Sequence, residues 1–321
     1  MHRTLVTGAG GPAAICFLRA QDAFDGFYMA DMDPLAPGLF LVPEDRRVIL
    51  PAGKAPEFIE HLLDCCRFLG ITRLVPTVDA ELLPIARQAA RFEALGIQLV
   101  LSPLEALETC LDKLRLHLRC RRLVPSPATV LAGRAPTATG PWIAKPRSGS
   151  GSRGIRMVDA STLASVPADG NWLIQECLPG AEYSVDVLIG PNGEALAAVP
   201  RERLRVDSGV ATVARTVKDP QLQRLALDAA QLVGIRGVAN VQLKRDANGM
   251  PKLMEINPRF PGTMALTVEA GANLPKLVMD IAEDKTVTSP EWKETAMVRT
   301  FSETFVDPAL FAAVDKASEA A

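Results

Sequence analysis

Apolar and polar residues follow two periods along the chain, and the balance between them changes near residue 102. In the first hundred residues, apolar strand-like runs alternate with helical stripes. Residues 56–70 place Leu62, Leu63 and Cys66 on one stripe and end on Gly70, which is typical of a helix C-terminus. Strands alternating with helices predict a parallel sheet covered by helices. We therefore expect a doubly wound parallel α/β domain over residues 1–102.

The rest of the chain is helical at first and then rich in strands. Residues 102–123 have a purely helical pattern, with Ser102 expected as N-cap, Pro103 at the first position and a local break before Lys113. Residues 171–190 have two apolar runs around a Pro-Gly turn, the second alternating with period two, and residues 196–217 and 238–260 predict hairpins. The fold class is therefore α/β followed by α+β.

Composition and charge exclude several classes of protein. The 321 residues carry 35 basic and 37 acidic side chains, which argues against a nucleic-acid partner. No apolar stretch is long enough for a membrane span or a leader peptide, so we expect a cytoplasmic protein without a membrane partner. Six cysteines lack paired spacing and only three histidines occur, so we expect reduced thiols and no zinc centre.

The stretch "LMEINPRFPG" sets an acid, an amide and a base two residues apart, at Glu255, Asn257 and Arg259. On a strand they share one face, while Met254 and Ile256 are expected to point into packing. Carboxylate and amide oxygens suit Mg²⁺, and an arginine suits phosphate oxygens. The pattern predicts a metal-bridged polyphosphate site. A solvated polar face of an edge strand is the alternative.

The predicted hairpin adds an amide to this set. In "VANVQLK", Val241 and Leu243 face one side and Gln242 and Lys244 the other. Because the neighbouring strand carries Glu255, Gln242 is expected to join it as a metal ligand.

A glycine-rich loop follows Lys145 in "KPRSGSGSRG". Its backbone N–H groups are suited to wrap an anion, which is how loops of this kind hold phosphate. The loop joins two strands and lacks the order of a Walker loop. A flexible linker is the alternative, and Lys113 taken alone has the features of an ordinary solvated lysine.

The first strand ends in a turn, Gly8–Ala13, that is close to a dinucleotide-binding fingerprint. Asp31 and Asp33 end the second strand, where a ribose-binding acid is expected in such proteins. A tight strand-to-helix turn needs small residues whether or not it binds a nucleotide, so an NAD-dependent oxidoreductase stays open as an alternative.

Arginines repeat in "PRERLRVD", where Arg201, Arg203 and Arg205 share a predicted strand face, with Arg215 on the returning strand. Such a row suits a substrate carboxylate or an acyl phosphate, with Arg201 and Arg203 the favoured members. It is equally well a solvated hairpin face.

Taken in order, these motifs resemble the ATP-grasp superfamily. Five pieces carry the resemblance: "DK" at 112–113, "KPRSGSGSRG", "IQECLPGAEYSVDV", "NVQLK" and "EINPRFPG". The pairing of "EINPR" with "VQLK" is most similar to the synthetase halves of the carbamoyl phosphate synthase large subunit. The resemblance implies an N-terminal Rossmann-like domain (1–102), a small ATP-grasp subdomain with the glycine-rich lid (103–170) and a C-terminal subdomain with the metal and catalytic site (171–321).

The resemblance also implies roles for matching positions. Lys113 and Lys145 are expected to contact the ATP phosphates, and the loop that closes over them contains Ser148, Gly149, Ser150, Gly151 and Gly154. Adenine is expected to contact Gln175 and the main chain of Glu176, Cys177 and Leu178, and the ribose is expected to contact Glu182. The expected ligands of Mg²⁺, with Mn²⁺ as an alternative, are Gln242, Glu255 and Asn257. Catalytic roles are expected for Arg259, which steadies the transferring phosphoryl group, and for Lys145, Arg201 and Arg203.

The implied activity is an ADP-forming carboxylate–amine ligase that works through an acyl phosphate on a small metabolite such as an amino acid. Gln242 departs from members of the superfamily that have an acid at that position. A kinase-like enzyme forming carbamate or carboxyphosphate derivatives and a nucleotide-binding regulatory protein remain alternatives. The expected partners are small-molecule carboxylates and amines, and a homodimer is left open.

Overall fold

The computed structural model describes residues 2–149, 151 and 153–308. Contacts divide the described residues into two compact units, one formed by 2–101 together with 299–308, the other by the described part of Ser102–Val298. The division near residue 102 coincides with the change in period. The described tail, 299–308, belongs to the first unit, whereas the predicted division assigned it to the C-terminal subdomain.

The first unit contains a parallel sheet of five strands in the order β3-β2-β1-β4-β5. The strands are β1 (Thr4–Thr7), β2 (Phe27–Asp31), β3 (Arg47–Ile49), β4 (Arg73–Val75) and β5 (Gln98–Leu99). The helices are α1 (Pro12–Arg19), α2 (Phe58–Leu69), α3 (Asp79–Arg87) and α4 (Ala89–Ala94), with short 3₁₀ helices η1 (Pro37–Leu41) and η2 (Glu44–Arg46). The predicted doubly wound α/β domain is confirmed.

Helix α2 follows its sequence pattern closely. Leu62, Leu63 and Cys66 are buried in the core, while Phe68 on the opposite side is exposed. Gly70 ends the helix in the left-handed conformation, with φ of 63°. A residue without a side chain adopts this conformation without strain, as the sequence predicted.

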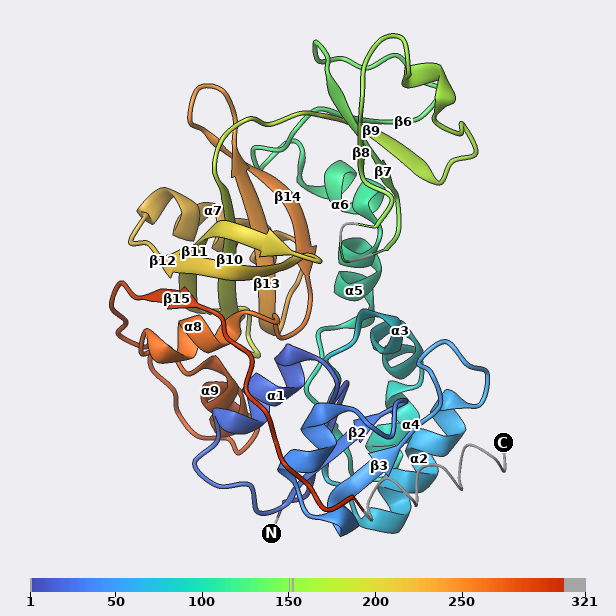
Figure 1. Cartoon of the computed structure of the whole chain (residues 1–321), viewed down its shortest axis with the longest axis vertical. Coiled ribbons are helices and arrows are strands. Elements are labelled where there is room, and N and C mark those ends of the chain that lie inside the picture. The colour runs from blue at the N-terminus through green and yellow to red at the C-terminus, as the bar shows by residue number, and fades with distance from the viewer. Residues whose placement is uncertain (1, 150, 152, 309–321) are drawn as a thin grey trace. The chain divides into compact units, whose positions relative to one another are not determined.

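The second unit contains two antiparallel sheets (Figure 1). The four-stranded sheet has the order β6-β9-β7-β8, with β6 (Thr129–Leu131), β7 (Trp142–Pro146), β8 (Arg156–Val158) and β9 (Trp172–Glu176). The six-stranded sheet has the order β14-β13-β10-β11-β12-β15, with β10 (Glu182–Ile189), β11 (Ala195–Asp207), β12 (Val210–Thr216), β13 (Gly237–Arg245), β14 (Pro251–Asn257) and β15 (Ala296–Val298). The two predicted hairpins are confirmed as β11–β12 and β13–β14, whereas the two apolar runs of 171–190 form β9 and β10 in different sheets.

The helices of this unit are α5 (Leu104–Leu111), α6 (Lys113–Cys120), α7 (Pro220–Leu232), α8 (Met264–Glu269) and α9 (Leu274–Ile281), with one short 3₁₀ helix, η3 (Leu163–Ser165). Helix α7 packs on the six-stranded sheet through Leu225 and Ala229, which lie in one core cluster with Val185 and Val241. One face of the sheet is therefore apolar and covered. Its other face is left to carry polar side chains.

The predicted start of the first helix here is wrong by one step. The N-cap position of α5 is Pro103, and Ser102 makes no capping bond. The Ser102 hydroxyl instead donates to the carbonyl of Arg236 at 2.7 Å and accepts from the Arg236 N–H at 3.2 Å. A partner distant in sequence has replaced the local cap. The break before Lys113 is confirmed, since α5 ends at Leu111 and α6 begins at Lys113.

Candidate functional site

A row of polar side chains crosses four strands of the six-stranded sheet. Ser184 on β10 lies opposite Arg201 on β11 and opposite Gln242 on β13, and Gln242 lies opposite Glu255 on β14. Side chains directly opposite each other share one face. The hairpin prediction that Gln242 joins Glu255 is confirmed in position.

A second polar row lies beside the first and is held by a buried carboxylate. Asp186 is fully buried and lies opposite Asn240, which lies opposite Asn257. Asp186 accepts from Arg201 at 2.5 and 3.0 Å, from the Asn240 amide at 2.9 Å and from the Thr267 hydroxyl at 2.6 Å. A buried carboxylate with hydrogen bonds from three side chains is compensated for its burial and holds those side chains in place.

Glu255, Gln242 and Asn257 together present one carboxylate and two amide oxygens on the two paired strands. The Asn257 amide nitrogen donates to Glu255 Oε1 at 3.3 Å, so its oxygen is left as an acceptor. This donor set fits a hard cation such as Mg²⁺. In the part of the chain that the structure describes, no three His, Cys, Asp or Glu side chains gather as a metal cluster. The set therefore brings a single negative charge.

A β-bulge changes the predicted face of Met254. Gln242 pairs with Glu255 but Leu243 pairs with Leu253, so Met254 is an extra residue on β14. Such a bulge bends the strand and redirects a side chain. Ile256 is buried as predicted, whereas Met254 lines a cavity instead of packing into the core.

Lys145 lies on β7, in the four-stranded sheet, and is almost fully buried. Its ammonium donates to Gln175 Oε1 at 2.9 Å. Burial lowers the pKa of Lys145 to about 8, with Glu255 opposing that change and Lys113 adding to it. Charged groups from β14 and from helix α6 therefore lie near this amine.

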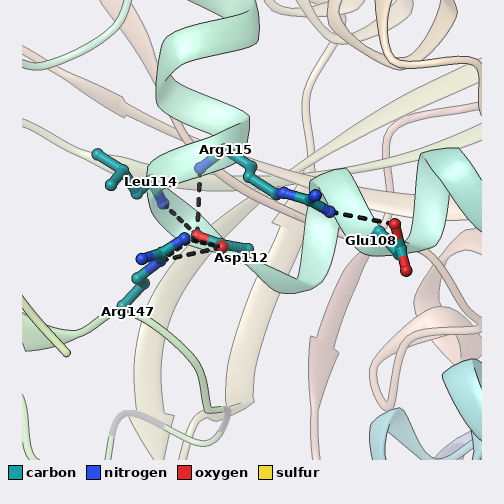
Figure 2. Close-up of polar contacts among 5 residues, drawn as sticks. All are labelled: Glu108, Asp112, Leu114, Arg115 and Arg147. Atoms are coloured by element: carbon teal, nitrogen blue, oxygen red, sulfur yellow. Dashed lines mark hydrogen bonds and ion pairs between the residues drawn. The ribbon is translucent and has the colours of Figure 1, made fainter. Parts of the chain in front are cut away.

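Asp112 fixes the start of α6 and the base of the glycine loop at once (Figure 2). Its carboxylate accepts from the N–H groups of Leu114 and Arg115 at 3.0 and 3.1 Å, as an N-cap does. It also accepts from the Arg147 guanidinium at 2.9, 2.9 and 2.6 Å. Burial alone would raise the pKa of Asp112, but the hydrogen bonds from Arg147, Arg115 and Leu114 outweigh it, so the pKa is lowered.

Lys113, the first residue of α6, is positioned by this anchor. Its N–H donates to the Arg147 carbonyl at 3.0 Å, and its ammonium donates to the Gly149 carbonyl at 2.6 Å. The same ammonium lies 4.0 Å from Glu255 Oε2. Lys113 thus reaches from the glycine loop to the candidate metal set.

One cavity of about 250 Å³ collects these groups from both sheets. Among its lining residues are Lys113, Lys145, Ser148, Gly149, Gly151, Gln175, Glu182, Gln242 and Glu255. The apolar part of the lining includes Ile143, Ile155 and Met254. Ser150 lies outside the described residues. Gly154 lies outside the lining and keeps a positive φ of 75° beside Pro146.

The residues predicted for adenine contact are only partly at this cavity. Gln175 lines it, whereas Glu176, Cys177 and Leu178 are outside its lining. The Glu176 carboxylate accepts from the Ala128 N–H at 3.0 Å and from Lys252 at 2.8 Å. These bonds tie the end of β9 to its neighbours, and the predicted main-chain contact stays a prediction.

A second cavity of about 250 Å³ adjoins the first and is strongly polar. It shares four lining residues with the first cavity, namely Gly151, Glu182, Gln242 and Glu255. Its further lining includes Ser184, Arg201, Arg203, Asn240, Asn257 and Arg259. The predicted catalytic arginines are therefore brought to one place, although their roles stay predictions.

The arginine row ends sooner than the alternation predicted. Leu204 is an extra residue on β11, because Arg203 and Arg205 pair with consecutive residues of β12. Arg205 is exposed, and Arg215 is bound to Glu202 at 2.7 Å on the other side of the strand. The predictions for Arg205 and Arg215 are wrong in position.

Comparison with protein families decides the class. Residues 169–304 match the model described as ATP-grasp in the biosynthetic pathway with Ter operon, and residues 7–100 match the PylC-like N-terminal domain. The chain contains an ATP-grasp domain and a PylC-like N-terminal domain. Its resemblance to the carbamoyl phosphate synthase large subunit in particular stays a prediction.

Three known proteins show how far the similarity extends. Carnosine synthase 1 of Gallus gallus is 30% identical over 38% of this chain and 16% of its own length. A D-alanine–D-alanine ligase of Alcanivorax borkumensis is 30% identical over 42% of this chain and 49% of its own length. The solved biotin carboxylase of Campylobacter jejuni is similar in fold, with a TM-score of 0.74 and 16% identity over 92% of this chain and 75% of that chain. The chain thus spans about half or less of the two curated relatives.

The N-terminal glycine turn, in the PylC-like domain, is used for packing. A Cβ on Gly38 would lie 2.4 Å from the Ala9 carbonyl oxygen, and the Gly38 N–H donates to that oxygen at 2.9 Å. Asp31, the expected ribose-binding acid, instead accepts from the Gly10 N–H at 2.7 Å. Helix η1 therefore covers the turn, which gives no support to a dinucleotide site.

Sequence reasoning missed some functional candidates in this ATP-grasp domain. Asp186, to which Asn240 and Thr267 donate, binds Arg201 of the second cavity, and Lys244 lines the first. The alternation of Glu182, Ser184 and Asp186 with apolar residues was a signal for β10. It gave no sign that Asp186 would meet an arginine and a threonine from other elements.

Proposed function

We propose that the protein is an ATP-dependent, ADP-forming carboxylate–amine ligase that acts through an acyl phosphate on a small metabolite such as an amino acid. The observation that carries the proposal is the first cavity, where Lys113, Lys145 and Glu255 meet below the glycine loop. Two cations, a metal-binding carboxylate and a loop rich in backbone N–H groups form a nucleotide triphosphate site.

Each residue then has a task in that site. Lys113 and Lys145 neutralise phosphate oxygens, and Gly149 and Gly151 let the backbone approach them. Gln242, Glu255 and Asn257 would hold Mg²⁺, or Mn²⁺ in its place, and the bound ion would supply charge neutralisation. Arg259 steadies the transferring phosphoryl group from the second cavity.

The reaction needs positioned charges more than a protein nucleophile. The substrate carboxylate attacks the γ-phosphorus of ATP, ADP leaves, and the amine then displaces phosphate from the acyl phosphate. Phosphoryl transfer of this kind depends on alignment and charge neutralisation. The second cavity, which shares Glu255 and Gln242 with the first, is the place for the carboxylate. The names of the two relatives, a carnosine synthase and a D-alanine–D-alanine ligase, support amino acids as substrates.

The test is a screen of paired carboxylates and amines for ADP release, followed by mass spectrometry of the product. Hydroxylamine added in place of the amine should trap an acyl hydroxamate. ADP release that needs both substrates, with a product of their combined mass less water, supports the proposal. Release that bicarbonate alone elicits would favour the carboxyphosphate-forming alternative, and no release with any pair would contradict ligase activity.

The surroundings of the protein follow from the same proposal. All six cysteines are free thiols, which fits a reducing cytoplasm. None of the helices in the described ranges has the length and apolar composition needed to cross a lipid bilayer. A homodimer stays a prediction, which light scattering on a sizing column would test.

A further inference from the structure

Lys244 is the lysine of the first cavity whose task is unassigned. It lies on β13, is partly buried and lines the cavity with Lys113 and Lys145. Those two lysines donate to Gly149 and Gln175, whereas the Lys244 ammonium forms no hydrogen bond or ion pair within residues 2–149, 151 and 153–308. Lys244 is only partly buried, so its ammonium remains available to a ligand that enters the cavity, and an anionic or hydroxyl oxygen there would be its partner.

The register places Lys244 at a definite distance from the metal set. It follows Gln242 by two residues on the same strand face, which is about 7 Å along a strand. Its cross-strand neighbour is Glu182, the first residue of β10. The Lys244–Glu182 pair therefore lies between the phosphate end of the cavity and the β9–β10 connection, where adenine is predicted.

A nucleotide bound in this order presents its ribose to that pair. Glu182 Oε1 is bound to the Arg203 guanidinium at 3.1 Å, which orients the carboxylate and leaves its second oxygen as an acceptor. A ribose hydroxyl both donates and accepts hydrogen bonds. The carboxylate can accept from one hydroxyl of the ribose diol while the ammonium on the adjacent strand donates to the other.

We infer that Lys244 binds the ribose hydroxyls of the nucleotide together with Glu182, and that it selects ribonucleotides over deoxyribonucleotides. The inference rests on the proposed function, because it takes ATP as the ligand. It goes beyond that function in naming a specificity-determining residue and the part of the ligand it recognises.

The test measures equilibrium binding by calorimetry with Mg²⁺ present, for ATP, 2′-deoxy-ATP and 3′-deoxy-ATP. Lys244→Met keeps the length of the side chain and removes the charge. We expect it to weaken ATP binding about tenfold, the size of one hydrogen bond from a charged donor. Binding of at least one deoxynucleotide should change little, so the preference for ATP over it should fall by about the same factor.

Lys285→Met is the matched control, because Lys285 pairs with Asp280 and Glu283 at the surface and should leave all three affinities unchanged. Equal losses for the three nucleotides would assign Lys244 to phosphate or base and overturn the inference alone, as would unchanged affinities. If the wild-type protein bound no ATP, the proposed function would fall, and the inference with it. Melting temperatures of both variants verify that they fold.

Discussion

Glu255 brings the only negative charge to the candidate metal set. Gln242 and Asn257, its neighbours on the same face, are neutral amides. Lys113 lies 4.0 Å from the Glu255 carboxylate, so that carboxylate also faces a cation from α6. In the proposed site, this one side chain would bind the metal and also face the lysine assigned to phosphate.

We predict that Glu255→Ala lowers the rate of ADP release by at least about a hundredfold, because the metal that positions the phosphoryl group loses its charged ligand. The melting temperature should change little, since Glu255 lies on a polar, partly exposed face. Glu291→Ala, at an exposed loop position, is the control and should behave as wild type. Near-normal ADP release from Glu255→Ala at ordinary Mg²⁺ concentrations would show that the metal assignment is wrong.

Glu81, on α3 of the first unit, is a buried acid with a role in stability. Burial raises its pKa to about 7, the Thr7 hydroxyl that donates to it opposes this change, and the charge of Asp31 adds to it. The folded state then holds the proton more tightly than the unfolded state. The stability gained from this proton is complete below about pH 4.5 and is lost as the pH rises through 7.

We predict that Glu81→Gln raises the melting temperature at pH 8 by several degrees and flattens its decline between pH 5 and 8. An amide of the same shape keeps an acceptor for Thr7 but cannot ionise, so it avoids a cost of up to about 3 kcal/mol. Glu93→Gln, exposed on α4, should keep the wild-type dependence on pH. Parallel pH curves for wild type and Glu81→Gln would contradict the raised pKa.

Among the elements, strand β11 and its hairpin partner β12 connect the two cavities to the glycine loop. The Arg203 guanidinium forms an ion pair with Glu182 through Nη1, and through Nη2 it donates to the Gly209 carbonyl at 2.9 Å. At the hairpin tip, Gly209 has φ of 81°, and a Cβ there would lie 3.2 Å from the Gly151 Cα. The bare backbone at Gly209 lets the tip approach the glycine loop.

We predict that Gly209→Ala lowers turnover more than Gly249→Ala does, at a similar loss of stability in the two variants. The reason is that the methyl group added at Gly209 pushes the hairpin tip away from Gly151. Gly249→Ala is the matched control, since Gly249 ends the other hairpin with φ of 78° and has nothing within 4 Å of an added Cβ. Both changes strain the backbone by about 1 kcal/mol or more. Equal loss of turnover in the two variants would exclude a specific role for the contact between Gly209 and Gly151.

In the whole molecule, two segments had the composition of a nucleotide site, one in each unit. The turn after β1 is covered by η1 and closed by Gly38 against Ala9. The loop after β7 opens onto a cavity lined by lysines. Small residues serve chain packing in the first case and leave room for a ligand in the second.

We predict that ATP with Mg²⁺ raises the melting temperature of the full chain and that NAD does not. A ligand at a hundred times its Kd stabilises the folded state by about 2.7 kcal/mol, and one that does not bind adds nothing. Thermal shift with each nucleotide measures this directly, and ATP without the metal gives the contribution of Mg²⁺. A shift with NAD alone would revive the oxidoreductase alternative.

The candidate site was predicted in part. From the sequence, Lys113, Lys145, Gln242 and Glu255 were expected together, and one cavity contains them all. The faces of Met254 and Arg205 were predicted wrongly because of two β-bulges. Met254 is itself the extra residue on β14, and Arg205 follows the extra residue on β11. The partners of Asp186 were unpredicted, since Arg201, Asn240 and Thr267 come from three other elements.

The sequence by itself determined which segments form strands and helices, because side-chain period, caps and turn residues act over a few neighbouring positions. Helix α2, strand β10 and the Asn248–Gly249 turn all form where those local patterns occur. Only the tertiary structure decided strand register, the two bulges, the closed N-terminal turn and the open position of Lys244. Those features depend on residues far apart in the chain, whose contacts no local pattern records.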